Sequence, residues 1–327
     1  MALLLIMGSV LIWETGWRAI GFEPSVTDDA GLWALARERA AGLGPEGVVL
    51  VGSSRMQMAI HRELFAEVTG WEPPVQLAVV RGPSFPVLRS LAEDSGFRGS
   101  VLCEVNPVLF FARTPWMERA IEEYVAVYAE FGLAKRVEQR LRMQVQQLLV
   151  ARLPALSPSS FAKKLRQRDI PVPGYNDLIT PDRFRYGDYG EFSNLETGNR
   201  VNALELDRAR PKYFEPGEWA TRMAELAGWV ETIRSRGGQV IFVRLPSTIF
   251  VRDFEQQWFP RVNFWDPFAA EIGAPAIHFE DHAQLAGLTP ADGEHLDVEG
   301  AMGFSRALGD ILVRLDLVPG PAAPARR

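Results

Sequence analysis

Short apolar runs alternate with amphipathic stretches along most of the chain. The runs occupy residues 48–51, 75–80, 101–105, 240–243 and 276–279. Apolar residues at helical spacing lie between them, for example over residues 56–65, 219–234 and, near the end, 298–315. Runs that are apolar at every position are typical of parallel strands buried on both faces. The pattern therefore predicts an α/β fold, a three-layer α/β/α sandwich with a mainly parallel five-stranded sheet.

A long segment from about residue 112 to 216 interrupts this alternation and predicts a helical insertion. Apolar residues recur at helical spacing from Met117 to Phe131, which indicates an amphipathic helix packed on the core. Residues 134–168 then hold one acid, Glu138, and nine cations: Lys135, Arg136, Arg140, Arg142, Arg152, Lys163, Lys164, Arg166 and Arg168. This stretch is either a solvated helical face balanced by acids from elsewhere or a surface for anionic lipid head groups or an acidic glycan.

The first residues favour a location at a membrane. Residues 2–13 form a run without charge that ends at Glu14, and Trp17 and Phe22 extend its apolar character. The run is shorter than the roughly 20 residues of a full span, and a buried helix is the alternative. No small-residue cleavage site precedes Glu14, so we expect a signal-anchor over residues 1–22, an α/β domain over 23–315 and a flexible tail over 316–327.

Composition narrows the class of protein. The 327 residues are 47% hydrophobic, enough for a large core, and the net charge of −6 argues against a nucleic-acid partner. The single cysteine, Cys103, lies within an apolar run and excludes a disulfide within the chain. His278 and His282 are weak candidates for a metal site. Their segment begins as an apolar strand, and in a strand this spacing does not place the two rings together as it does on one face of a helix in zinc motifs. We therefore expect no metal.

Two short segments carry candidate chemistry. Gly52-Ser53-Ser54 ends the first apolar run, and Asp292-x-x-His295 precedes the last helix. Alone, the serines fit a helix cap and the aspartate fits a turn. A nucleophilic hydroxyl, however, needs a base, and the base needs a carboxylate. Because ligands of open α/β sheets bind at the carboxyl ends of strands, the two segments together predict a nucleophilic site there.

These residues resemble those of the SGNH or GDSL hydrolases, a family with a flavodoxin-like sandwich. The resemblance looks closest to the membrane-anchored branch with alginate O-acetylation proteins and the D-alanyl lipoteichoic acid enzyme. It implies that Ser54 is the nucleophile, His295 the general base and Asp292 its carboxylate. It also implies an oxyanion hole formed by the amides of Ser54 and Gly82 and the side chain of Asn106.

The sequence departs from the family pattern at two points. Ser53 replaces the usual aspartate of the first block, and Asn106-Pro107 stands where the family has Gly-x-Asn-Asp, so a plain turn asparagine is the alternative for Asn106. These departures favour a second interpretation, a non-catalytic, membrane-anchored scaffold of a polysaccharide-modification complex.

The implied activity is that of an extracytoplasmic or periplasmic, membrane-anchored serine acyl esterase or O-acetyltransferase. It would act through an acyl-serine, without a cofactor, on an envelope or exported polysaccharide. Its partners would be an acylated glycan or small ester, the membrane and, for transfer, a membrane-bound acyl donor protein.

Overall fold

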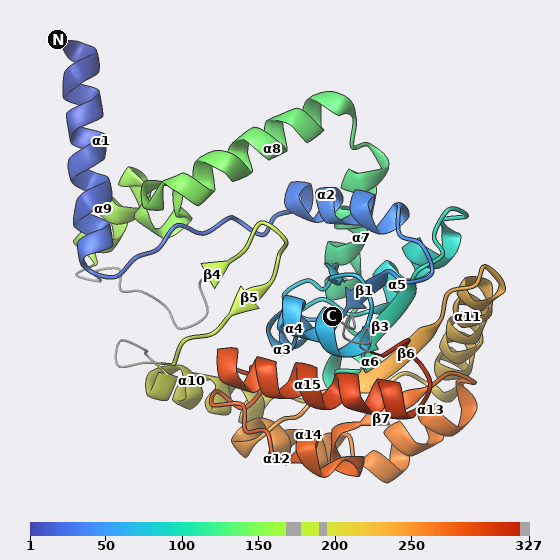
Figure 1. The fold of residues 1–327 in the computed structure, drawn as a ribbon. Helices are drawn as coiled ribbons and strands as arrows, with labels where there is room; N and C mark the ends of the chain where they lie inside the picture. The colour runs from blue at the N-terminus through green and yellow to red at the C-terminus, as the bar shows by residue number, and fades with distance from the viewer. Residues whose placement is uncertain (168–177, 190–194, 321–327) are drawn as a thin grey trace, which may run out of the picture.

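A five-stranded parallel sheet forms the centre of the molecule, as the apolar runs predicted. The computed structural model describes residues 1–167, 178–189 and 195–320 (Figure 1). The strands are β1 (Val48–Val51), β2 (Val75–Gln76), β3 (Ser100–Glu104), β6 (Val240–Arg244) and β7 (Ala276–His278). Their order is β2-β1-β3-β6-β7, and every pair is parallel. The α/β class and the five-stranded parallel sheet are therefore confirmed.

Helices cover both faces of the sheet, because alternate strand residues point into two separate cores. Val49 and Val101 pack in one core, with α2 (Ala30–Ala41), α5 (Phe85–Glu93), α6 (Pro107–Phe111), α11 (Pro216–Ser235), α12 (Ile249–Trp258) and α13 (Trp265–Glu271). Leu50 and Leu102 pack in the other, with α3 (Ser54–Ala59), α4 (Arg62–Thr69), α14 (Ala283–Ala286) and α15 (Val298–Arg314). This arrangement is the expected three-layer sandwich.

Two details differ from the prediction. The helix expected over residues 56–65 is divided into α3 and α4, because Ile60 adopts an extended conformation and the His61 ring caps α4 by accepting from the Leu64 amide. The second apolar run pairs as a strand only at Val75 and Gln76. At the next residue, the Leu77 carbonyl accepts a hydrogen bond from the Trp33 indole N–H and not from the backbone N–H of a neighbouring strand.

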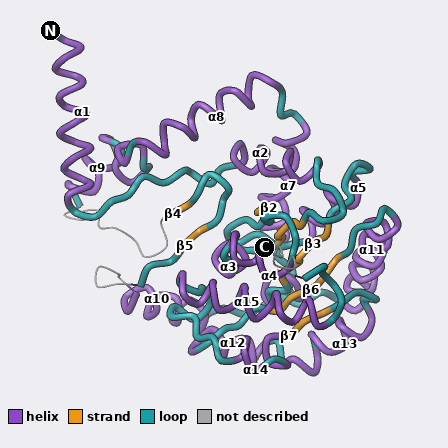
Figure 2. Tube along the Cα trace, viewed as in Figure 1, coloured by secondary structure: helices purple, strands orange, loops and turns teal. Residues whose placement is uncertain are grey.

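The segment expected to form an insertion holds helices and one hairpin. It contains α7 (Pro115–Ala129), α8 (Leu133–Leu148), the short 3₁₀ turns η1 (Val150–Arg152) and η2 (Pro154–Leu156), α9 (Pro158–Arg166) and α10 (Leu195–Arg208). The hairpin pairs β4 (Leu178–Ile179) with β5 (Arg185–Tyr186). Helix α7 packs on α2 and α5, whereas α8 and α9 extend toward the amino terminus (Figure 2).

The amino-terminal helix α1 (Ala2–Ala19) projects from the body of the molecule (Figure 1). Its last turns pack against α9 through edge-on contacts of Trp13 and Trp17 with Phe161. The Glu14 carboxylate accepts from the Val150 and Ala151 amides at 3.0 and 2.9 Å and so caps η1. Across the described ranges, no helix combines the length and apolar character needed to cross a bilayer.

The first residues of the segment expected to be a flexible tail contact the body of the molecule. Leu317 and Val318 pack on the core beside α15, and the Gly320 amide donates to the Thr69 carbonyl at 2.9 Å. Residues 321–327 of that tail lie outside the described residues.

Candidate active site

The candidate nucleophile, Ser54, is the first residue of α3 and follows the carboxyl end of β1. Gly52 makes the turn possible, with a φ of +156° and no room for a Cβ, which would lie 2.4 Å from Glu104 Oε2. The same carboxylate accepts from the Ser53 amide at 2.6 Å and from the Ser53 hydroxyl at 3.0 Å. Ser53 also caps α3 by accepting from the Arg55 amide. The first serine is thus engaged structurally, and Ser54 faces the cavity.

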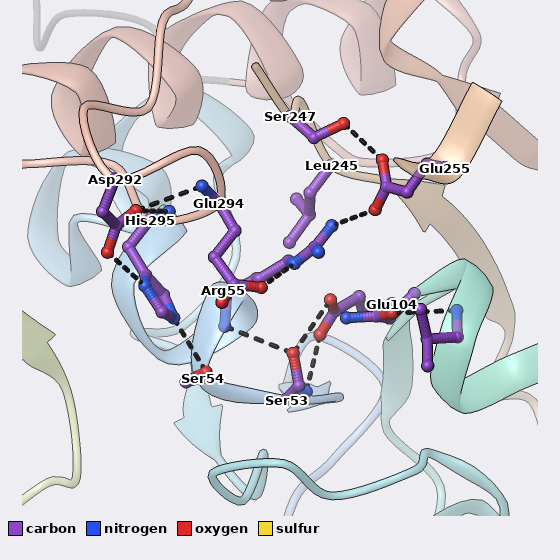
Figure 3. A network of polar contacts seen from close by, with 12 residues as sticks. Ser53, Ser54, Arg55, Glu104, Leu245, Ser247, Glu255, Asp292, Glu294 and His295 are labelled. Atoms are coloured by element: carbon purple, nitrogen blue, oxygen red, sulfur yellow. Dashed lines mark hydrogen bonds and ion pairs between the residues drawn. The ribbon is translucent and has the colours of Figure 1, made fainter. Parts of the chain in front are cut away.

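The structure brings Ser54, His295 and Asp292 together in one hydrogen-bonded chain (Figure 3). His295 Nε2 lies 2.8 Å from Ser54 Oγ, and His295 Nδ1 lies 2.8 Å from Asp292 Oδ2. The other oxygen, Asp292 Oδ1, accepts from the backbone amides of His295 and Glu294 at 2.8 and 3.1 Å. With the Nδ1 proton held by the carboxylate, Nε2 is free to accept the serine proton.

The charges around His295 favour its protonated form. Burial alone would lower the pKa of His295, but the hydrogen bond to Asp292 and the charges of Glu294 and Asp292 outweigh burial and raise it. Burial would likewise raise the pKa of Asp292, yet the hydrogen bonds from His295 lower it. An ionised Asp292 would therefore stabilise an imidazolium at His295.

The loop that carries His295 is fixed from two sides. Gly293 has a φ of +95°, and a Cβ there would lie 2.6 Å from Val251 Cγ2 on α12. The Gly293 carbonyl accepts from the Thr248 amide at 2.9 Å. On the other side, the Tyr189 hydroxyl donates to the His295 carbonyl at 2.9 Å.

A set of charges, buried except for the partly exposed Glu294, lies beside the chain of three residues (Figure 3). Arg55 is 4% exposed and donates to Glu255 at 2.8 Å and to Glu294 at 2.9 Å. Glu255 also binds Arg244 and the Ser247 hydroxyl. Burial would raise the pKa of Glu255, but the two arginines lower it, so the carboxylate stays charged.

Sequence reasoning did not find these groups. Glu104 had a usable signal, since it is the one charge inside the apolar run 101–105. Arg244 is a second such signal, because it is a charge that directly follows the apolar run 240–243. Nothing local distinguishes Arg55 or Glu255 from surface residues.

The predicted oxyanion hole is assembled in part. Considering only described residues, the Ser54 amide has no hydrogen-bond partner, and neither has the Asn106 amide nitrogen. Asn106 lines the same cavity as Ser54, and its Oδ1 accepts from the Val108 amide as the cap of α6. The prediction for Gly82 is not met, because its N–H points at the Val79 carbonyl, 2.7 Å away, and closes a turn. Ser54 and Asn106 are therefore the available donors.

Ser54 opens into a cavity of about 570 Å³ at the carboxyl ends of the strands. Its apolar wall comes from Leu109 on α6, Leu206 on α10 and Phe254 on α12. Arg81, with a left-handed φ of +57°, and Glu205 bring charge to its lining. The size suits a small acyl group together with part of an alcohol.

Two of the other histidines, His278 and His61, have structural surroundings. The buried His278 ring stacks on Phe279, meets Trp265 edge-on and accepts from the Glu280 amide at 3.2 Å. Burial, followed by the nearby arginines, lowers the pKa of His278 to about 3. His61 caps α4 as described above.

Comparison with models of known protein families found no match, and comparison with curated proteins found none either. The resemblance to SGNH hydrolases therefore stays a prediction, supported by the residues and geometry of this site.

Proposed function

We propose that this chain is an SGNH-like serine acyl esterase or O-acyltransferase that forms an acyl-serine on Ser54. One observation carries the proposal: Ser54 Oγ, the His295 ring and Asp292 are joined by two hydrogen bonds of 2.8 Å at the mouth of a cavity. A helix cap or a turn needs neither contact.

In the proposed reaction, His295 Nε2 takes the proton from Ser54 Oγ while the oxygen attacks the acyl carbon. The Ser54 amide and the Asn106 side chain donate to the oxyanion. The bond from the acyl carbon to the leaving alcohol then breaks, and that alcohol takes the proton from His295. Water or a second alcohol repeats these steps in reverse and releases the acyl group from the serine.

The substrate class and the location are part of the proposal and rest on the family resemblance. We infer an O-acyl, specifically O-acetyl, group on an envelope or exported polysaccharide, handled outside the cytoplasm by a membrane-anchored protein. The exposed apolar residues Val10, Leu11 and Ile12 of α1 support attachment to a membrane.

A non-catalytic scaffold of a polysaccharide-modification complex is the second candidate. The observation that favours it is the Gly82 amide, which is committed to the Val79 carbonyl and leaves the oxyanion hole with two donors. Loss of one such donor typically costs about 10²–10³ in kcat.

Labelling with a fluorophosphonate separates the two candidates, because the reagent reacts with an activated serine and not with a capping serine. The full chain should be labelled, and Ser54→Ala and His295→Ala should not. Ser53→Ala is the matched control for the serine and should retain labelling, although the lost cap costs about 1 kcal/mol of stability. His61→Ala is the control for the histidine. A folded protein that stays unlabelled under conditions that label a known serine esterase would favour the scaffold.

A further inference from the structure

Helix α8 displays its apolar face to solvent. Five large apolar residues repeat every three or four positions, and their exposed fractions are 75% for Leu133, 48% for Val137, 63% for Leu141, 43% for Val145 and 68% for Leu148. This spacing places them in one line along the helix, which we call the α8 stripe. A helix on the surface of a soluble domain usually has the opposite orientation.

The opposite face of α8 is the polar one, and it is fastened to the body. Gln139 and Gln146 are buried there. Gln139 donates to the Asp29 carboxylate at 3.2 Å, and Gln146 donates to the Thr27 hydroxyl at 2.9 Å. These contacts fix the rotation of α8, so the exposure of the stripe follows from specific hydrogen bonds.

Unpaired positive charge lies on α8 and on the turn and helix that follow it. Three cations of the basic stretch are balanced, since Lys135, Arg136 and Arg142 pair with Glu130, Glu38 and Asp29. Four others are exposed and form no ion pair with any described residue: Arg140, Arg152, Lys163 and Arg166. Arg168 lies outside the described residues. None of the described cations of this stretch lines the cavity at Ser54, which removes the main argument for an acidic glycan bound there.

The carboxyl end of the stripe lies next to the carboxyl end of α1. Arg18 of α1 donates to the Leu148 carbonyl, at the end of α8, at 3.0 Å. Figure 1 shows that α1 projects from this end of α8, and that α8 lies on the same side of the molecule as α1. The carboxyl ends of α1 and α8 therefore meet at one corner of the molecule, close to α9, whose last turn carries Lys163, Lys164 and Arg166.

We propose that the α8 stripe lies on the surface of an anionic phospholipid bilayer. An interfacial helix has an apolar face for the acyl boundary and cations for the head groups, and α8 with its neighbours provides both. The contact would hold the body against the membrane beside α1. This inference rests on the membrane location in the proposed function and is independent of the chemistry at Ser54.

A fluorophore at residue 141 tests this placement in the full chain. The single native cysteine, Cys103, is fully buried, and burial raises its pKa to about 12, so a thiol label at neutral pH should ignore it. Leu141→Cys carries an environment-sensitive nitrobenzoxadiazole. Val262→Cys is the matched control, an apolar residue 69% exposed in the turn between α12 and α13. Unsubstituted protein treated with the reagent reports any labelling of Cys103.

The protein is mixed with vesicles of 70% phosphatidylcholine and 30% phosphatidylglycerol. We expect the emission at position 141 to shift to the blue and to be quenched by nitroxide-bearing lipid, while position 262 is unchanged. Replacing Arg140, Arg152 and Lys163 by Gln should weaken the contact about 100-fold, at roughly five-fold per cation.

Three results would overturn the inference. In the first, the protein sediments with the vesicles, but the fluorophore at position 141 stays as exposed to water as the one at position 262. The shift could be equal on pure phosphatidylcholine, which would remove the role of charge. It could also appear without vesicles and grow with protein concentration, which would identify a second copy as the occupant. Fluorophosphonate labelling of Ser54 in the same samples is expected to be unaffected, so failure here is distinguishable from failure of the proposed activity.

Discussion

The two oxygens of Asp292 have different partners, and this predicts that asparagine at this position lowers stability little and activity strongly. Among the described residues, Oδ1 accepts from two backbone amides, and Oδ2 accepts only from the His295 ring. In Asp292→Asn, the amide oxygen should stay on the two N–H groups, because an NH₂ group turned toward them would leave buried donors unsatisfied at about 1–3 kcal/mol each. The NH₂ group then faces His295 Nδ1, which can only accept from it.

The consequence for catalysis follows from the tautomer. A ring that accepts at Nδ1 carries its proton on Nε2, and at 2.8 Å from Ser54 Oγ that nitrogen cannot take the serine proton. In the serine protease triad, the same exchange lowers kcat about 10⁴-fold. Because a tenfold change in rate is about 1.4 kcal/mol, the expected loss of transition-state stabilisation is about 5 kcal/mol. Stability should fall far less than in Asp292→Ala, which leaves both amides without a partner and should cost about 2–6 kcal/mol.

The assay is hydrolysis of an aryl acetate, with denaturant unfolding measured on the same preparations. Asp297→Asn is the matched control, because Asp297 caps α15 by accepting from the Gly300 amide at 2.7 Å and asparagine caps equally well. Its activity should equal that of the unsubstituted chain. If Asp292→Asn keeps more than a tenth of the activity while Ser54→Ala is inactive, the proposed role of Asp292 is wrong.

Two further predictions concern His295 and its loop. Since the pKa of His295 is raised and catalysis needs the neutral ring, the acidic limb of the aryl acetate rate should lie above the ordinary histidine value of about 6.5. Glu294→Gln removes a charge that favours the imidazolium and should move that limb to lower pH; an unchanged limb would contradict the assignment. Gly293→Ala forces a Cβ toward Val251 at a positive φ, and thermal unfolding should show a loss of about 1–3 kcal/mol together with lower activity. Gly217→Ala, where a Cβ meets open space in the first turn of α11, is its control; it should leave the activity unchanged and should not lower the stability.

The parts of the fold that could be predicted are those in which local pattern and global burial agree. Every residue of β1, β3 and β6 is buried, so a short run of mainly apolar residues was a sufficient signal. Within such a sheet, the candidate Ser54 follows one strand and Asn106 follows its neighbour. Their convergence at one edge needed no further information.

Hydrophobic periodicity did not predict local breaks in a helix, the direction of a backbone N–H or contacts between residues that are distant in the sequence. The hydrophobic spacing of residues 56–65 averages over the break at Ile60, which is local and involves no proline or glycine. For Gly82 the sequence identified a glycine near the site but carried no information on the direction of its N–H. Arg55 and Glu255 are 200 positions apart, and a charged side chain in a helix is normally at the surface, so their burial could not be anticipated.

The buried charges have a physical relation to the candidate reaction. An ion pair inside a protein contributes little net stability compared with apolar packing, because desolvation offsets the attraction. The ion pair of Arg55 with Glu294 joins the same two segments as the hydrogen bond between Ser54 and His295. Arg55 follows Ser54 in the sequence, and Glu294 precedes His295. Glu255 fixes the guanidinium from α12, and so the separation of the two segments is set by contacts other than the reacting pair. The hydrogen bond between Ser54 and His295, which must break and re-form during the proposed reaction, is thus held at 2.8 Å by charged side chains that exchange no proton in it.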